Sequence, residues 1–154
     1  MRTYFLILFL MIVACSCEEK VKNVAEESAK RSLELLSVDR EFSSMSEKEG
    51  MKNAYIEYID SNGVLLRPSQ LPIVSANAID FLIQQDDADF SLTWNPQHAE
   101  VAASGEMGFT YGIYALRPKT YDTIFYGTYT NIWKKQGDGK WKLLLNAGNE
   151  GIEE

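Results

Sequence analysis

Histidine, cysteine and clustered positive charge are scarce in this chain. Its 154 residues include one histidine, two cysteines, and 15 Lys or Arg against 22 Asp or Glu, giving a formal net charge of −7. Because a nucleic acid is bound through grouped basic side chains, we expect no nucleic-acid partner. The single histidine, His98, leaves no set of ligands at metal-binding spacing, so we also expect no metal and no cofactor. His98 alternates with the apolar Ala99 and is predicted to lie on the surface.

Motifs of the common enzyme classes are missing as well. The sequence contains no G-x-G-x-x-G, P-loop, G-x-S-x-G or C-x-x-C string. A Ser-His-Asp triad would have to use His98, and no serine has surroundings that support one. The sequence therefore predicts a fold and a pocket, but it names no reaction.

The amino terminus has the layout of a bacterial lipoprotein signal. Arg2 supplies a positive charge, residues 4–13 form an apolar run too short to span a bilayer, and small Ala14 precedes Cys15. We expect cleavage after residue 14, lipidation of Cys15, and anchoring to a membrane of the bacterial cell envelope on its periplasmic or surface face. The alternative is an ordinary secretory peptide cut near Ala14. A lipidated Cys15 leaves Cys17 without a partner, so no disulfide framework would support the fold.

Behind the signal (residues 1–14), we expect a lipidated tether over residues 15–30 and one domain over residues 31–154. The tether is rich in Glu, Lys and Ala and has no sustained apolar stripe. In the domain, apolar residues at helical spacing predict three helices, over about 31–45, 46–59 and 76–85. A capping box at Ser46 and Glu49 would begin the second helix, and a turn over residues 60–63 would end it.

After residue 89 the apolar spacing changes from helical to alternating. The alternation predicts long strands over about 90–103 with a bulge or loop at Pro96, then 107–117, 123–133 and 141–145, besides a short earlier strand at 64–67. Helices come first and antiparallel strands follow. This order indicates the α+β class, with N-terminal helices packed on one face of a strongly curved antiparallel sheet.

Several short strings occur in a fairly specific order along the domain. They are DREF at 39–42, GVLLRP at 63–68, LTWNP at 92–96, TYG at 110–112, GTY at 127–129 and DGKWK at 138–142. In this order they resemble the cystatin-like cone of the nuclear transport factor 2-like superfamily, which includes ketosteroid isomerase, scytalone dehydratase and SnoaL-like cyclases. The chain is most similar to an uncharacterised SnoaL-like group of bacterial domains of unknown function. The resemblance covers about residues 33–149.

Two positions depart from the pattern of this resemblance. The string SANAI at 75–79 stands where relatives often have a Gly-Arg pair before Ala-Ile, and Asn146 stands where many have aspartate. The missing ionisable group at position 146 argues against carboxylate chemistry there. The acid–base residues of ketosteroid isomerase have no counterparts that can be matched residue by residue.

Asp39 is the candidate catalytic residue. It lies inside the apolar stripe of the first predicted helix, between Leu35 and Phe42, where a carboxylate is unfavourable unless it is paired. Facing a pocket, it could act as a general base. Alternatively, it is a structural carboxylate paired with Arg67 or a tyrosine hydroxyl, or a partly exposed edge residue.

A concave site lined by aromatic side chains with a few polar groups is the expected pocket. Its candidate residues are Tyr55, Trp94, Tyr111, Tyr129, Trp133 and Asn146. The leading hypothesis is a lipid-anchored envelope protein that binds a small hydrophobic molecule without turning it over. One alternative is a SnoaL-like isomerase or hydro-lyase that uses Asp39 with a tyrosine donor such as Tyr111 or Tyr129. Another is a homodimer whose exposed sheet face is an interaction surface.

Overall fold

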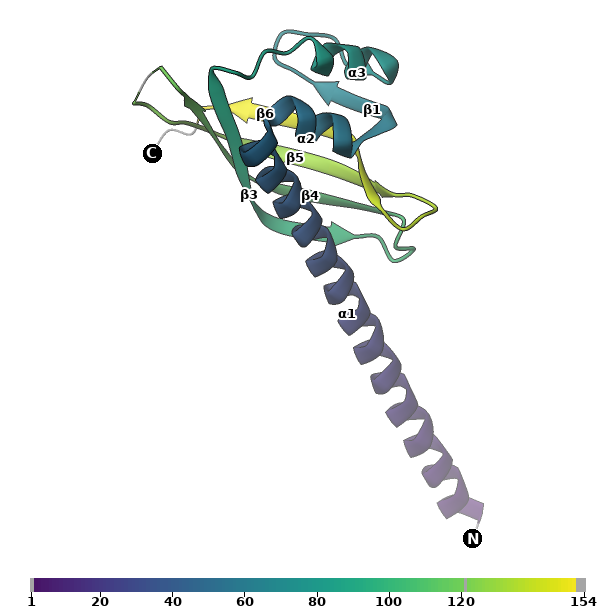
Figure 1. The fold of residues 1–154 in the computed structure, drawn as a ribbon. Helices are drawn as coiled ribbons and strands as arrows, with labels where there is room; N and C mark the ends of the chain where they lie inside the picture. Colours follow the sequence, from purple (N-terminus) through teal and green to yellow (C-terminus); the bar gives the residue numbers. More distant parts are fainter. Residues whose placement is uncertain (1, 121, 152–154) are drawn as a thin grey trace.

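The computed structural model describes the backbone of residues 2–120 and 122–151 and the side chains of residues 24–120 and 122–151. Within these ranges, three helices lie on one face of a six-stranded sheet (Figure 1). The helices are α1 (Arg2–Glu49), α2 (Met51–Tyr58) and α3 (Ala76–Ile83). The strands are β1 (Ile59–Leu66), β2 (Ile73–Val74), β3 (Phe90–Val101), β4 (Met107–Pro118), β5 (Phe125–Lys135) and β6 (Trp141–Glu150).

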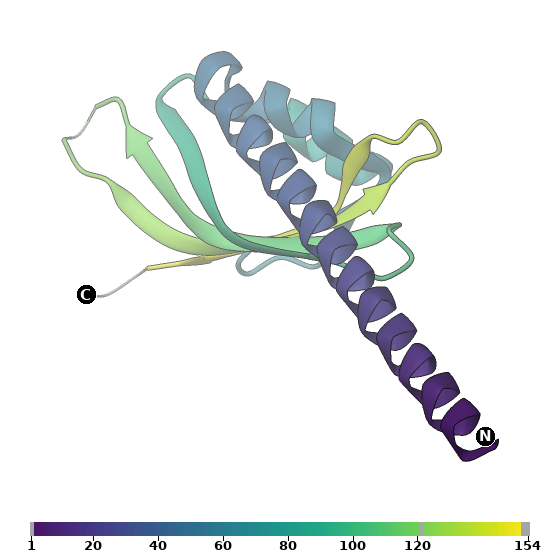
Figure 2. The ribbon, with the colours of Figure 1, turned by 90° about the horizontal axis from the view of Figure 1, so that it is seen from below.

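The sheet has the order β2-β1-β6-β5-β4-β3 and is strongly curved. The pairs β3–β4, β4–β5 and β5–β6 are antiparallel, whereas β1 runs parallel to β6. Figure 2 shows the concave face of the sheet turned toward the helices. The predicted fold class, helices packed on a curved and mainly antiparallel sheet, is therefore confirmed.

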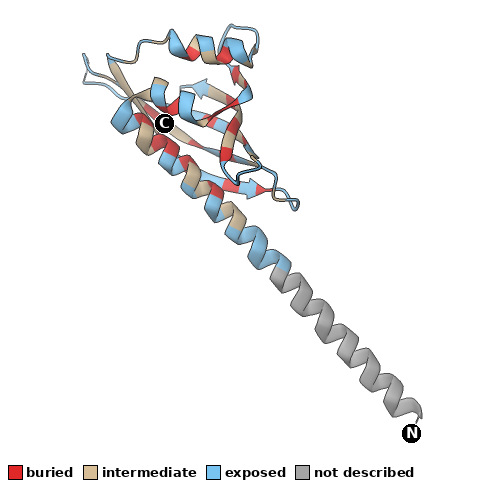
Figure 3. Ribbon diagram, turned by 45° about the vertical axis from the view of Figure 1, so that its right-hand side comes forward, coloured by how far each residue is buried: buried red, intermediate tan, exposed pale blue. Residues whose placement is uncertain are grey.

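Helix α1 packs on the concave face through one stripe of side chains. Leu35, Asp39 and Phe42 are fully buried at intervals of three or four residues, as an amphipathic helix requires. Figure 3 shows the buried residues on the side of α1 that faces the sheet. The helix is longer than the apolar pattern predicts, because it begins at Arg2, and residues 24–30 are helical and exposed.

The predicted capping box at Ser46 is wrong. Helix α1 continues through this residue, and the buried Ser46 hydroxyl donates to the carbonyl oxygen of Leu92 on β3 at 2.6 Å. The break falls at Gly50, whose φ of 93° is a conformation that residues with a side chain rarely adopt. Tertiary contact with β3 thus decides the role of the serine, which a local sequence pattern cannot show.

The predicted turn over residues 60–63 is also wrong, because β1 already begins at Ile59. This part of β1 is irregular: its register against β6 shifts between Ile59 and Val64, and the Asp60 side chain accepts the backbone N–H of Asn62 at 2.8 Å. The turn-forming residues therefore make an irregularity within a strand. In α3, Leu82 is buried, whereas Ile83 is 55% exposed.

Two glycines decide which face of β4 lies against α1. A Cβ atom added at Gly108 would lie 2.6 Å from Leu35 Cδ2, and one added at Gly112 would lie 2.2 Å from the carbonyl oxygen of Asn95. These close approaches place the glycine face of β4 inside and leave the alternate residues, among them Tyr111, on the outer face. The predicted irregularity at Pro96 is confirmed by a register shift between Pro96 and His98.

A single core fills the space between the helices and the concave face. Its aromatic members surround Phe42, whose ring lies 4.5 Å from Trp94 and 5.8 Å from Trp133, both in edge-on contact. Among the residues that the structure describes, no helix is long and apolar enough to cross a membrane.

Candidate functional site

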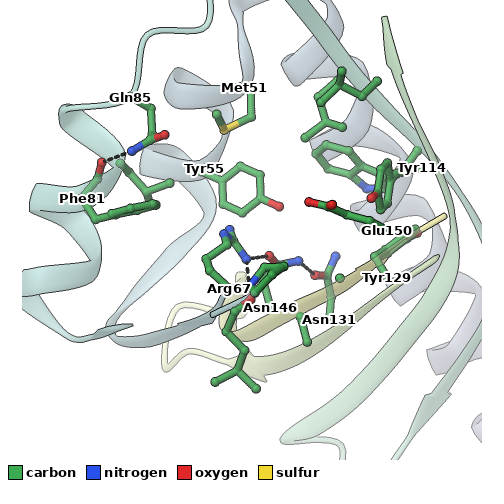
Figure 4. A pocket seen from close by; sticks show the side chains of 18 of the residues that line it. Met51, Tyr55, Arg67, Phe81, Gln85, Tyr114, Tyr129, Asn131, Asn146 and Glu150 are labelled. Atoms are coloured by element: carbon green, nitrogen blue, oxygen red, sulfur yellow. Dashed lines mark hydrogen bonds between the residues drawn. The ribbon is translucent and has the colours of Figure 1, made fainter. Parts of the chain in front are cut away.

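A cavity of about 480 Å³ lies between α2, α3 and the concave face of the sheet (Figure 4). Its walls are mostly apolar, with residues from both helices and from five strands. They include Met51, Tyr55, Phe81, Leu82, Phe90, Leu92, Trp94, Tyr114, Leu116 and Tyr129. The polar lining residues are few: Arg67, Gln70, Gln85, Asn131, Asn146 and Glu150. An apolar hollow with a small set of polar groups is the usual form of a small-molecule site.

Arg67 is the cationic residue in the cavity wall. It follows the end of β1, and its Nη1 donates to the side-chain oxygen of Asn146 at 2.7 Å and to the carbonyl oxygen of Leu66 at 3.0 Å. Its guanidinium carbon lies 5.9 Å from the centre of the Tyr55 ring. These contacts fix the guanidinium at the cavity wall next to a tyrosine.

A chain of side-chain hydrogen bonds leads from Arg67 to Asp39. Asn146 accepts from Arg67 and donates its amide N–H to the side-chain oxygen of Asn131 at 2.7 Å. Asn131 in turn donates to Asp39 at 3.2 Å. Because a carboxylate can only accept, Asp39 orients both amides so that each presents its oxygen toward the arginine end of the chain.

Asp39 lies behind the cavity wall rather than in it. It is fully buried, and it accepts the indole N–H of Trp94 at 2.8 Å, the Tyr129 hydroxyl at 2.9 Å and the Asn131 amide. Burial raises the pKa of the Asp39 carboxyl, while hydrogen bonds from Thr110, Trp94, Tyr129 and Asn131 act in the opposite direction. Its partner is therefore a tyrosine hydroxyl, and Arg67 reaches it only through two amides.

Tyr129 separates Asp39 from the cavity. Its hydroxyl proton points to the carboxylate, and burial together with the negative charge of Asp39 raises the pKa of the Tyr129 hydroxyl. The tyrosine is therefore neutral at physiological pH, and its proton is shared with a buried acceptor rather than offered to the cavity.

The structure brings four of the six predicted pocket residues to the cavity: Tyr55, Trp94, Tyr129 and Asn146. Trp133 does not line it; its side chain is completely buried in the core and donates to the Thr110 hydroxyl at 2.9 Å. The prediction that Tyr111 lines the pocket is wrong. This residue lies on the outer face of β4, 45% exposed and 5.6 Å from the His98 ring. The side chain of Cys15 falls outside the described residues.

Sequence reasoning missed two polar residues of this site. Arg67 was considered only as a partner of Asp39, although its position between a strand and Pro68 placed it at a sheet end. Asn131 shares a strand face with Tyr129 and Trp133, and an amide on an otherwise aromatic inner face was the available indication. In the part of the chain with described side chains, no group of three or more His, Cys, Asp or Glu could hold a metal ion.

Solved structures with this architecture resemble the chain at low sequence identity. A ketosteroid isomerase-like protein from Erwinia carotovora atroseptica SCRI1043 is 12% identical, covers 77% of this chain and 95% of its own, and has a TM-score of 0.58. The chain has the nuclear transport factor 2-like fold. A cystatin-like domain of unknown function from Nostoc punctiforme PCC 73102 is 9% identical over 76% of this chain and 77% of its own, with a TM-score of 0.63.

A third structure of this fold belongs to an enzyme. An epoxide hydrolase from M. tuberculosis is 11% identical, covers 78% of this chain and 80% of its own, and has a TM-score of 0.55. No family model matches the chain, and no curated protein matches its sequence. The nuclear transport factor 2-like fold thus hosts enzymes and domains of unknown function alike, and at these identities the similarity extends to the fold alone.

Proposed function

We propose that this protein binds a small, largely apolar molecule in the cavity and does not convert it chemically. The observation that carries the proposal is the position of Asp39. A general base has to approach the proton it removes to about 2.6–3.2 Å or act through one water. Asp39 lies behind Trp94, Tyr129 and Asn131, and both of its oxygens already accept hydrogen bonds.

The other ionisable groups at the cavity do not replace Asp39 as a catalytic base. The guanidinium of Arg67 has five N–H donors and no acceptor, so it cannot serve as a base. Burial raises the pKa of the Tyr55 hydroxyl, which keeps it neutral. Glu150 is exposed near the end of β6. The cavity therefore offers shape, apolar surface, one fixed cation and, from Glu150, one exposed carboxylate, which are properties of a binding site.

The binding proposal is tested with a neutral aromatic probe, 2-naphthamide, by isothermal titration. The full chain is reconstituted in phosphatidylcholine nanodiscs, and empty discs serve as the blank. Met51 lines the cavity, so the bulky Met51→Trp variant should weaken binding at least tenfold. The matched variant Met107→Trp changes an exposed residue on the outer sheet face and should bind like the wild type. Equal affinity of the two variants, or no binding to the wild type, contradicts the proposal.

A second candidate function is a SnoaL-like isomerase or hydro-lyase. It is favoured by the contact of Tyr129 with Asp39 at 2.9 Å, since Tyr129 also lines the cavity and could pass a proton between the two. Molecules that co-purify with the chain would be identified by mass spectrometry and incubated with wild-type protein. A conversion that the Asp39→Asn variant abolishes, while this variant still binds 2-naphthamide, would replace the binding-only proposal.

A third candidate is a homodimer formed through the outer face of the sheet. Met107, Phe109, Tyr111 and Tyr126 expose apolar surface there, between 37% and 47% of each residue. Apolar patches of this kind mark interaction surfaces more often than ordinary surface does. Light scattering after size exclusion of the full chain in detergent distinguishes a monomer from a homodimer. A monomeric mass at high protein concentration contradicts the homodimer.

For the cellular location, we propose a protein anchored to the bacterial envelope through fatty acylation of Cys15. The support is the signal-like sequence: a charged start, a ten-residue apolar run, then Ala14 and Cys15. Intact-mass measurement of the chain expressed in bacteria should show the loss of residues 1–14 and the added acyl mass. Cys15→Ser should abolish the added mass and the membrane fraction, whereas Cys17→Ser should change neither. An unmodified Cys15 in the wild type contradicts the proposal.

A further inference from the structure

Arg67 has hydrogen-bonding capacity that its protein contacts do not use. A guanidinium carries five N–H donors, and the hydrogen bonds of Arg67 to Leu66 and Asn146 both come from Nη1. Within residues 24–120 and 122–151, the Tyr55 hydroxyl also interacts with the guanidinium, and none of the ion pairs involves Arg67. The arginine therefore presents unpaired positive charge at the cavity wall.

Asn146 holds this charge without neutralising it. Its side-chain oxygen accepts from Arg67 at 2.7 Å, and its amide donates to Asn131. An aspartate of the same shape would form an ion pair with Arg67 and cancel the positive charge. The asparagine therefore gives the geometry of an ion pair while leaving the charge available to a ligand.

The groups around Arg67 favour a ligand with one anionic end. Tyr55 lies beside the guanidinium, and Figure 4 shows its hydroxyl between the side chains of Arg67 and Glu150. A neutral phenol and a guanidinium are both hydrogen-bond donors, which suits an acceptor-only group such as a carboxylate. The walls beyond them are apolar and include Met51, Phe81 and Leu92.

Glu150 limits the ligand to a single negative charge. It is the other charged residue among those that line the cavity, and it comes from the end of β6. A second carboxylate on the ligand would face this like charge without a cation to balance it. The cavity of about 480 Å³ is within the range of roughly 300–1,000 Å³ usual for small-molecule sites.

We propose that the cavity binds a small monocarboxylate with an apolar body, whose carboxylate is held by Arg67 and Tyr55. This inference rests on the proposed binding function and names its ligand class. Arg67 follows the end of β1, and Tyr55 belongs to α2. The carboxylate of the ligand would therefore lie between these two elements, close to Asn146 of β6.

The test compares two probes that differ in charge and little else, 2-naphthoate and 2-naphthamide. Both are titrated calorimetrically into the full chain in nanodiscs. A charge-assisted hydrogen bond should make the carboxylate bind about 10- to 100-fold more tightly than the amide. Arg67→Met should reduce this ratio to about one. The matched Arg117→Met variant removes an exposed arginine that contacts Thr93 outside the cavity and should keep the ratio.

The outcomes separate the ligand class from the binding function. If the amide binds as tightly as the carboxylate to the wild type, or if the ratio survives in Arg67→Met, the carboxylate proposal is wrong and the cavity remains a binding site. If neither probe binds, both proposals fail. Asn146→Asp gives a second measure, since it should remove the preference for the carboxylate, whereas Asn149→Asp on exposed β6 surface should keep it.

Discussion

Trp94 donates its indole N–H to the carboxylate of Asp39 at 2.8 Å, and both side chains are buried. This bond joins β3 to α1 in the centre of the core. Because Tyr129 and Asn131 on β5 donate to the same carboxylate, Asp39 connects one helix to two strands. Its main role in the structure is to accept hydrogen bonds that would otherwise be lost on folding.

Removing the Asp39 carboxylate should destabilise the fold strongly. Asp39→Ala leaves the buried donors of Trp94, Tyr129 and Asn131 without this acceptor, and each such group costs about 1–3 kcal/mol, so we expect a loss of about 3 kcal/mol or more. Asp39→Asn keeps one accepting oxygen and should lose less. Urea unfolding of both variants, followed by tryptophan fluorescence, measures the difference. Equal stability of Asp39→Ala and wild type would show that the network contributes nothing.

Asp39 should also make stability depend on pH in an unusual direction. Burial raises the pKa of its carboxyl in the folded state above the value of about 3.8 in the unfolded chain, so the folded state binds the proton more tightly. Between these two pKa values the folded chain carries more protons, and the free energy of unfolding falls as pH rises. Stability from this group is complete below the unfolded pKa and is lost as pH rises through the folded pKa.

The Asp39→Asn variant isolates this effect from the other carboxyls. Hydrogen bonds from Lys135 and Trp141 lower the pKa of Glu34, and a backbone hydrogen bond from Asn62 lowers that of Asp60, so these groups favour folding at higher pH. They are unchanged in the variant. The difference in unfolding free energy, wild type minus Asp39→Asn, should therefore decrease as pH rises from 4. A difference that grows with pH contradicts the raised pKa.

Ser46 should stabilise the fold through β3 and not as a helix cap. Its hydroxyl donates to the Leu92 carbonyl at 2.6 Å, so Ser46→Ala leaves that carbonyl without this donor and should cost about 1 kcal/mol. Ser44→Ala changes a partly buried serine on the same helix and should cost less. The urea concentrations at the unfolding midpoints of Ser46→Ala and Ser44→Ala, each measured against the wild type, give the two losses of stability. Similar losses in both variants would mean that the contact with Leu92 is unimportant.

The arrangement of elements was predictable from the sequence, whereas several local details were not. The alternation of Tyr129, Asn131 and Trp133 placed β5 and its inner face correctly, because a half-buried strand exposes every second residue. In β4 the more apolar alternate set, which includes Met107, Phe109 and Tyr111, lies on the outer face, so the apolar pattern pointed to the wrong face for Tyr111. The orientation of β4 follows from the lack of room for a side chain at Gly108 and Gly112, which is visible only in the packed structure.

In the candidate site as well, local sequence pattern predicted some features, whereas others depend on tertiary contacts. An aspartate within the apolar stripe of a helix indicated a paired carboxylate, and Asp39 is one. Asn146 reaches the inner face because the register of β5 against β6 shifts between Ile132 and Trp133, which pair with Leu145 and Leu143. Such a shift reverses the side-chain alternation, and the residues of β6 alone do not reveal it.

Gly108 should tolerate no side chain. A Cβ atom there would lie 2.6 Å from Leu35 Cδ2 and 2.7 Å from the carbonyl oxygen of Glu100, so Gly108→Ala should cost about 1–3 kcal/mol by forcing α1 from the sheet. Gly137→Ala is the control, because a Cβ at Gly137 would have no atom within 4 Å. Thermal unfolding compares the two variants. An unchanged midpoint for Gly108→Ala would show that α1 can move away without loss.

Glu150 should weaken the binding of an anionic ligand. Its carboxylate lines the same cavity as Arg67, so Glu150→Gln removes a repulsion and should tighten binding of 2-naphthoate about two- to fivefold at low ionic strength. The gain should shrink in 0.5 M salt because Glu150 is exposed and solvent ions screen it. Binding of the neutral 2-naphthamide should stay unchanged.

Glu100→Gln provides the matched control for this prediction, because Glu100 is exposed on β3 and does not line the cavity. Both variants raise the net charge of the chain by one, so a general effect of protein charge would tighten 2-naphthoate equally in the two. A gain confined to Glu150→Gln instead requires that the bound carboxylate lies close enough to Glu150 to be repelled by it. Weaker binding in Glu150→Gln would place the anionic end of the probe away from this part of the cavity and count against Arg67 as its partner.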